Sequence, residues 1–128
     1  MTDNEVMEKI YKALVQDKEV MAILGNPRTP KERRDKIHMT RKELEVLDGA
    51  SMPMLVMFWH GGGDTQNSYY IRQSLVIQYY ATDREQGVRL KGAVRRVMTT
   101  MDYRRSSSGD NSGKFFCCSD IFKVIVWN

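Results

Sequence analysis

Residues 54–101 read MLVMFWHGGGDTQNSYYIRQSLVIQYYATDREQGVRLKGAVRRVMTTM, and residues 115–127 read FFCCSDIFKVIVW. The apolar run Met54–His60 is followed by the glycine-rich segment Gly61–Ser68, which predicts a strand that leads into a turn or flexible loop. Tyr69–Tyr80 then alternates apolar and polar side chains, which is typical of a half-buried strand. Two strands joined by a short glycine-rich segment predict a β-hairpin.

The segment after this hairpin changes to the period of a helix. Within Arg84–Met101 the following apolar residues recur at helical spacing and predict one continuous stripe: Leu90, Val94, Val97, Met98 and Met101. Tyr103–Lys114 is rich in serine and glycine and predicts a loop. Phe115–Trp127 has apolar side chains on both faces, which is typical of a strand that is central or covered on both sides. The order from residue 54 is therefore strand, strand, helix, strand.

The alternation in Tyr69–Tyr80 divides its side chains between two faces of the sheet. One face should pack against the helices, with Gln73 as its polar exception: Tyr69, Ile71, Leu75, Ile77 and Tyr79. The other face should meet solvent or a neighbouring subunit. Its residues Tyr70, Val76 and Tyr80 make it more apolar than contact with solvent requires, so they are the candidate subunit interface.

The chain before the hairpin predicts two helices. The first begins near Thr2 or Asp3, because Thr2 and Glu5 have the spacing of a capping box ahead of an apolar helical pattern. Asp17 predicts the cap of a second, short helix, and Gly25 stands where a left-handed residue would end it.

Residues 27–48 form a variable, strongly basic excursion that is harder to interpret. Thr29 and Pro30 could cap and start a short helix, and Ile37–Met39 could form a short edge strand. An excursion that only a partner orders is an equally open alternative.

Together these patterns predict one α/β domain of the α+β type, spanning residues 1–128. Its sheet should be mostly antiparallel, with helices packed on one face, in the order α-(variable)-β-β-α-β. The longest apolar run is far shorter than the roughly 20 residues that a membrane helix needs, so we expect no membrane contact.

Positive charge is concentrated in two parts of the chain. The net charge is +4, and the basic residues gather between residues 28 and 42 and again between 95 and 105. Each group could be a solvated surface, or it could contact nucleic acid or an acidic protein rim. The candidate residues for contacts with a partner or with the lumen of an assembly are Arg28, Arg33, Arg34, Arg104 and Arg105.

No residues have the spacing of a known catalytic or metal site. Cys117 and Cys118 are neighbours in a predicted strand and should point to opposite faces, which disfavours a disulfide and indicates a reducing compartment. His60 and Asp64 flank glycines that resemble the oxyanion-hole glycines of some lipases, but the G-x-S-x-G nucleophile motif is absent. His38 and His60 are not part of a paired metal-binding motif. We therefore expect no catalytic residues, no metal, no cofactor and no enzymatic activity.

The layout resembles that of the tail-completion or tail-terminator proteins of long-tailed bacteriophages. These proteins begin with an amphipathic helix like EVMEKIYKALVQDKEVMAILG, residues 5–25 here. A variable basic stretch and a proline-led strand follow, here MPMLVMFWH at residues 52–60. A long strand then runs into Thr-Asp and a helix, as residues 69–101 do, and a late strand such as IFKVIVWN at residues 121–128 closes the sheet.

This resemblance implies a structural virion protein without catalytic residues. Such proteins assemble in the host cytoplasm into a ring, usually a hexamer, that caps the tail tube in the phage neck and joins it to the head. The implied partners are further copies of the chain, the tail tube, the head-completion or connector proteins, and DNA in the lumen.

The alternative is a small module that binds nucleic acid through its sheet. Tyr70, Arg72 and Tyr80 on the outer face could stack on bases and contact phosphates. Such a module would be a monomer whose binding depends strongly on salt.

Overall fold

The computed structural model describes residues 3–39, 52–63, 70–111 and 116–127, and their side chains except at 61–63, 70–72, 110–111 and 126–127. Its elements, in chain order, are α1 (Asp3–Gln16), α2 (Lys18–Ile23), α3 (Pro30–Lys36), β1 (Ile37–His38), β2 (Met54–Gly63), β3 (Tyr70–Ala81), α4 (Arg84–Thr100), β4 (Arg105–Asn111) and β5 (Phe116–Trp127). The strands form one five-stranded sheet in the order β1-β2-β3-β5-β4. Only the short β1 is parallel to its neighbour, and all other described pairings are antiparallel.

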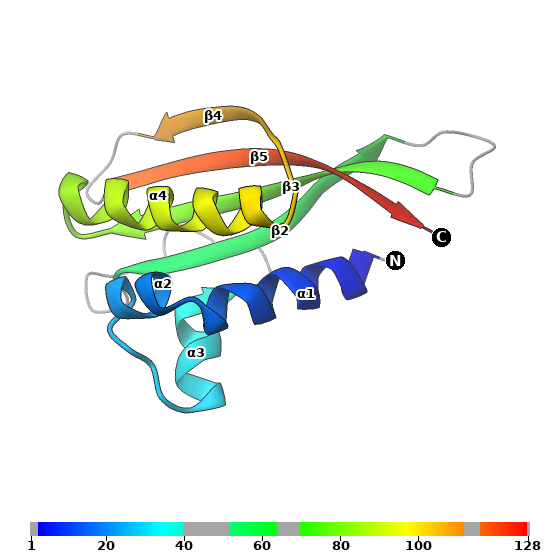
Figure 1. Ribbon diagram of the computed structural model, residues 1–128. Helices are drawn as coiled ribbons and strands as arrows, with labels where there is room; N and C mark the ends of the chain where they lie inside the picture. The colour runs from blue at the N-terminus through cyan, green and yellow to red at the C-terminus, as the bar shows by residue number, and fades with distance from the viewer. Residues whose placement is uncertain (1–2, 40–51, 64–69, 112–115, 128) are drawn as a thin grey trace.

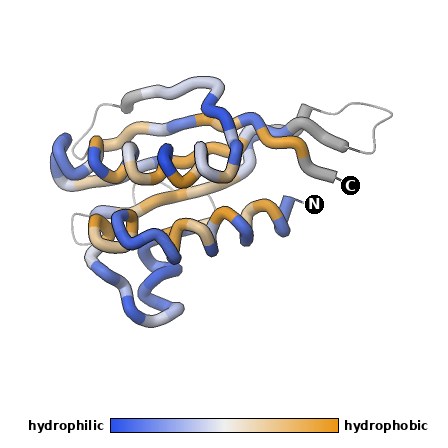
Figure 2. Tube along the Cα trace, in the orientation of Figure 1, coloured by the Kyte–Doolittle hydropathy of each residue, from blue (hydrophilic) through white to orange (hydrophobic). Residues whose placement is uncertain are grey.

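Helices α1 and α4 lie side by side on one face of this sheet (Figure 1). The stripe predicted for α4 faces the sheet: Leu90, Val94, Val97 and Met98 are buried in the same cluster as Leu75, Ile77 and Tyr79 of β3, and Met101 packs against it. The apolar sides of α1 and of the central strands meet there (Figure 2). The α+β class, the mostly antiparallel sheet and the packing of these helices on one face are thus confirmed.

The ends of the N-terminal helices also follow the sequence. Asp17 caps α2 by accepting a hydrogen bond from the backbone N–H of Val20. At the other end, Gly25 and Asn26 have φ angles of 92° and 54°, and the N–H of Asn26 donates to the carbonyl of Met21. This is the hydrogen-bonding pattern of a left-handed helix cap, which glycine adopts without strain.

The basic excursion begins as a helix and a strand. Thr29 caps α3, with Pro30 at its first position, and β1 pairs with β2 at the sheet edge. Both features match the sequence-based interpretation. None of the residues of α3 is buried, and Figure 2 shows the helix as hydrophilic along most of its length. Residues 40–48 of the predicted excursion lie outside the described residues.

The structure corrects two boundaries in the second half of the chain. The predicted loop Tyr103–Lys114 contains the strand β4, because pairing with β5 compensates for the low strand propensity of serine and glycine. The predicted turn begins later than Gly61, since β2 continues through Gly63 past an irregularity in its register. At the start of α4, Asp83 caps the helix by accepting a hydrogen bond from the backbone N–H of Gln86.

The outer face of β3 differs from the prediction. Val76 and Tyr80 are only 7% and 2% exposed, so the expectation that they form an open subunit interface was wrong for these two residues. Tyr80 belongs to a second apolar cluster on this face, with Met52, Met54 and Val56. Val76 and Tyr80 lie opposite Phe58 and Met54 of β2, and such cross-strand neighbours cover side chains that the alternation alone would place in contact with solvent. The side chain of Tyr70 lies outside the described ones.

Two glycines of α4 should respond to alanine in opposite directions. A Cβ atom at Gly87 would overlap the ring of Phe116, whereas a Cβ atom at Gly92 would have no neighbour within 4 Å. We expect Gly92→Ala to stabilise the fold by about 0.5–1 kcal/mol, because alanine loses less backbone entropy in a helix. Gly87→Ala should destabilise it by about 1–3 kcal/mol through overpacking. Chemical denaturation of both variants measures this, and an equal gain in stability would show that Phe116 does not pack on α4.

Candidate functional site

A buried carboxylate lies where α4 crosses β3 and β5. Asp120 of β5 is 0% exposed, on the face that also carries Phe122 and Val124. Its two oxygens accept hydrogen bonds from Nε and Nη2 of Arg95, at 2.8 and 2.7 Å, and the hydroxyl of Tyr79 donates to it at 2.8 Å. Arg95 therefore binds the carboxylate in a bidentate geometry, in which an arginine–carboxylate ion pair is strong.

These contacts determine the protonation states of Tyr79 and Arg95. Burial, together with the negative charge of Asp120, raises the pKa of Tyr79 well above its usual value, so the phenol remains a hydrogen-bond donor. The hydrogen bonds to Asp120 raise the pKa of Arg95, which remains charged. The group is therefore a fixed ion pair with a neutral donor.

A pocket opens beside this group at the C-terminal end of α4. Its volume is about 460 Å³, and we call it the α4-end pocket. The residues that line it are Arg95, Thr99, Asp102, Tyr103, Arg104, Arg105 and Phe122. Two of the five arginines predicted as partner contacts, Arg104 and Arg105, therefore share one concave site with Arg95.

The end of α4 shapes the rim of this pocket. Asp102 has a φ of 64°, and the N–H of Tyr103 donates to the carbonyl of Met98, which closes the helix with a left-handed cap. Because the chain reverses direction at Asp102, Arg104 and Arg105 follow the helix end at once and lie at the mouth of the pocket.

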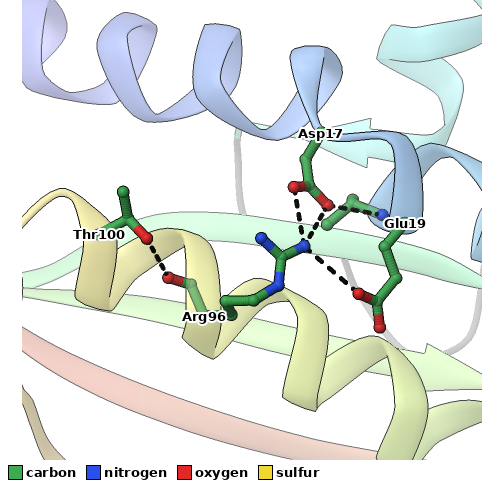
Figure 3. A network of polar contacts seen from close by, with 5 residues as sticks. Asp17, Glu19, Arg96 and Thr100 are labelled. Atoms are coloured by element: carbon green, nitrogen blue, oxygen red, sulfur yellow. Dashed lines mark hydrogen bonds and ion pairs between the residues drawn. The ribbon is translucent and has the colours of Figure 1, made fainter.

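A second arginine of α4 has a structural role. Arg96 donates from Nη2 to both oxygens of Asp17 at 2.8 Å, and it approaches Glu19 at 3.4 Å (Figure 3). Burial opposes ionisation of Asp17, but Arg96 together with the backbone N–H groups of Val20 and Glu19 outweighs this effect, so the pKa of Asp17 is lowered. The contact joins the start of α2 to α4, and Arg96 is 51% exposed, so we assign it to packing.

The remaining predicted arginines lie elsewhere. Arg33 and Arg34 belong to α3, which leads directly into β1, and Arg28 precedes that helix. β1 and β4 are opposite edges of the sheet, four strand spacings or roughly 19 Å apart, and the two basic groups adjoin different edges. The structure thus places the five arginines in two groups rather than one.

Arg34 already has an intramolecular contact. Its guanidinium lies 5.1 Å from the centre of the Tyr11 ring, within range of a cation–π interaction that holds α3 against α1. Among the arginines predicted as partner contacts, Arg104 and Arg105 line the α4-end pocket.

Asp120, the most buried charged residue described, is not among the residues that the sequence singles out. A signal was present, because Asp120 alternates with Cys118, Phe122 and Val124 on the face of β5 that the pattern assigns to the core. A charge at such a position requires a partner, since an unpaired buried carboxylate is very costly. Arg95 and Tyr79 are 25 and 41 residues away in sequence, so no local motif could identify them.

Within the described ranges, no three or more histidine, cysteine, aspartate and glutamate side chains gather as a metal ion would require. None of the described helices combines the length and the apolar character needed to cross a membrane. Cys118 is buried and Cys117 is partly exposed on the opposite face, as their positions in the strand predicted.

No protein-family model matches this chain, and no curated protein matches it significantly.

Proposed function

We propose that this chain is a structural subunit of a phage virion, which assembles into a hexameric ring at the head–tail junction and completes or terminates the tail tube. The proposal rests mainly on the order and packing of the elements. The chain runs from an N-terminal helical pair through a basic excursion and a hairpin to a helix and a late strand. The strands form one sheet, and α1 and α4 pack on the same face of it. That layout is the one the resemblance to tail-completion proteins implies.

A ring also needs a surface that a neighbouring copy can cover. On the sheet face opposite the helices, Ile125 of β5 is 52% exposed, and Ile121 on the same face is partly exposed. Since a ring interface is head-to-tail, this patch must meet a different surface of the next copy. We therefore move the proposed subunit contact from Val76 and Tyr80, which are buried, to Ile121 and Ile125.

The experiment compares two exposed apolar residues on opposite sides of the molecule. We expect the wild-type chain to sediment as a ring, and Ile125→Asp to shift it to monomers, because a charge would be buried in the contact. Val88 on α4 is 45% exposed, which makes Val88→Asp a matched control that should leave the ring intact. Sedimentation velocity at several protein concentrations measures the mass of each species.

Two results would contradict this proposal. A wild-type chain that stays monomeric at high concentration, also in the presence of its tail tube, would remove the ring. Equal dissociation of the ring by Ile125→Asp and Val88→Asp would show that the contact is not on the outer face of β5.

The alternative function, a sheet that stacks on nucleic-acid bases, now has less support. Stacking requires an exposed aromatic ring, and Tyr80 is 2% exposed in the second apolar cluster. Any contact with nucleic acid would therefore have to use a site other than the ring of Tyr80.

A further inference from the structure

The α4-end pocket carries more positive charge than its own acidic groups neutralise. Arg95 is fully engaged with Asp120, so this pair contributes little net charge. Arg105 comes no closer than 4.0 Å to Asp120, and in the described part of the chain no side-chain hydrogen bond joins Arg104 or Arg105 to another residue. Only Asp102 opposes them in the lining, which leaves about one positive charge for a ligand.

We propose that the α4-end pocket binds a singly charged phosphate group, such as a phosphodiester of a nucleic-acid backbone. Three residues whose side chains carry hydrogen-bond donors line it from different segments: Thr99 on α4, Arg104 on the connection, and Arg105 on β4. Donors from several directions suit the tetrahedral oxygens of a phosphate, and arginine is the side chain best suited to hold them. One net positive charge matches one phosphodiester.

A carboxylate ligand fits this arrangement less well. A carboxylate is planar and is bound best by the two arms of one guanidinium, as Asp120 is by Arg95 in the same pocket wall. The guanidinium best placed to hold a second carboxylate in this way is therefore already used. Arg104 and Arg105 line the pocket from consecutive positions, so two separate guanidinium groups are available to one ligand.

This inference goes beyond the ring and does not depend on it. The pocket is built from a single chain, so a monomer should bind phosphate as well as an assembled subunit does. Binding and assembly are measured separately, and failure of one leaves the other standing.

The first test uses two small ions of equal charge. Dimethyl phosphate carries the single charge of a phosphodiester, and acetate carries that of a carboxylate. In an NMR titration of the wild-type chain, we expect dimethyl phosphate to shift the backbone amide signals of Thr99, Arg104 and Arg105 at lower concentration than acetate does. Equal or stronger shifts with acetate, or no shifts at these residues, would overturn the proposal.

The second test identifies the source of the phosphate and uses a charge-matched control. A single-stranded oligonucleotide of about a dozen nucleotides is titrated at several salt concentrations, with inorganic phosphate as the competitor. We expect Arg104→Gln combined with Arg105→Gln to weaken binding by at least about tenfold. The slope of log affinity against log salt should fall by about 0.7, which corresponds to one lost phosphate contact on a single strand. Both arginines are exposed, so the melting temperature should change little.

The control removes the same charge at the other end of the same helix. Arg84 and Arg89 are exposed residues of α4 that do not line the pocket, so Arg84→Gln with Arg89→Gln should retain binding. If both double variants weaken binding equally, general positive charge binds the oligonucleotide and the pocket is not a site. Binding of inorganic phosphate without any binding of the oligonucleotide would exclude nucleic acid as the source and confirm the phosphate chemistry.

Discussion

Replacing Asp120 by alanine should lower the free energy of unfolding by on the order of 3 kcal/mol, although the residue is far from any predicted motif. The substitution leaves the hydroxyl of Tyr79 buried without an acceptor and leaves Arg95 without its carboxylate. Breaking one side of a buried ion pair is costly because the remaining charge is not solvated again. Arg95 is 31% exposed and can turn partly to water, so we place the loss at the lower end of the usual range. Equilibrium denaturation in urea measures it.

Two neighbouring arginines on α4 provide the control. Arg95→Met removes the partner of a fully buried carboxylate, whereas Arg96→Met removes that of Asp17, in a contact where Arg96 is 51% exposed. We expect a large loss of stability for the first and little change for the second. In a double-mutant cycle, Arg95→Met should cost much less when Asp120 is already alanine. Equal costs in both backgrounds would show that the two residues do not interact.

Predictions of the fold succeeded where the signals in the sequence are local. The caps Asp17 and Thr29 satisfy N–H groups only a few residues away, so a short motif contains all the information needed. The stripe on α4 was equally clear, since a helical period places every apolar residue on one side. The two-sided apolar pattern of β5 likewise indicated a central strand, and β5 lies between β3 and β4.

Predictions failed where pairing across the sheet decides the outcome. β4 is a strand because β5 offers it hydrogen-bonding groups, and nothing in the composition of Arg105–Asn111 indicates this. Tyr80 is buried by cross-strand neighbours, although alternation placed it on a solvent-facing side. A strand pattern assigns a residue to a face, but it does not tell what covers that face.

For the same reason, the sequence predicted Arg104 and Arg105 of the candidate site but not the pocket that they line. Charge density identified Arg104 and Arg105, but it identified Arg33 and Arg34 equally, and these lie at the opposite edge of the sheet. What distinguishes the first pair is the pocket beside the Arg95–Asp120 ion pair, which only the tertiary structure assembles. The composition of a segment shows that it is basic, but the pocket forms only when α4, β4 and β5 pack together.

Replacing Val94 by aspartate should be the most destabilising of the substitutions considered. Val94 is 0% exposed in the middle of the α4 stripe and faces Leu75 and Ile77 of β3. A carboxylate there would have to be protonated or hydrated at the expense of core packing, with a loss of at least about 3 kcal/mol. That is a large fraction of the roughly 5–15 kcal/mol by which a natural domain is stable. Thermal unfolding followed by circular dichroism measures the effect.

The same substitution at Val88 separates burial from helix propensity. Val88 lies in the same helix but is 45% exposed, so Val88→Asp introduces an identical side chain with the same cost in propensity. Because a carboxylate at this exposed position stays hydrated, this variant should unfold close to the wild-type temperature. Unchanged stability in Val94→Asp would mean that α4 does not pack on β3. A large loss in both variants would mean that α4 depends on its own propensity rather than on the sheet beneath it.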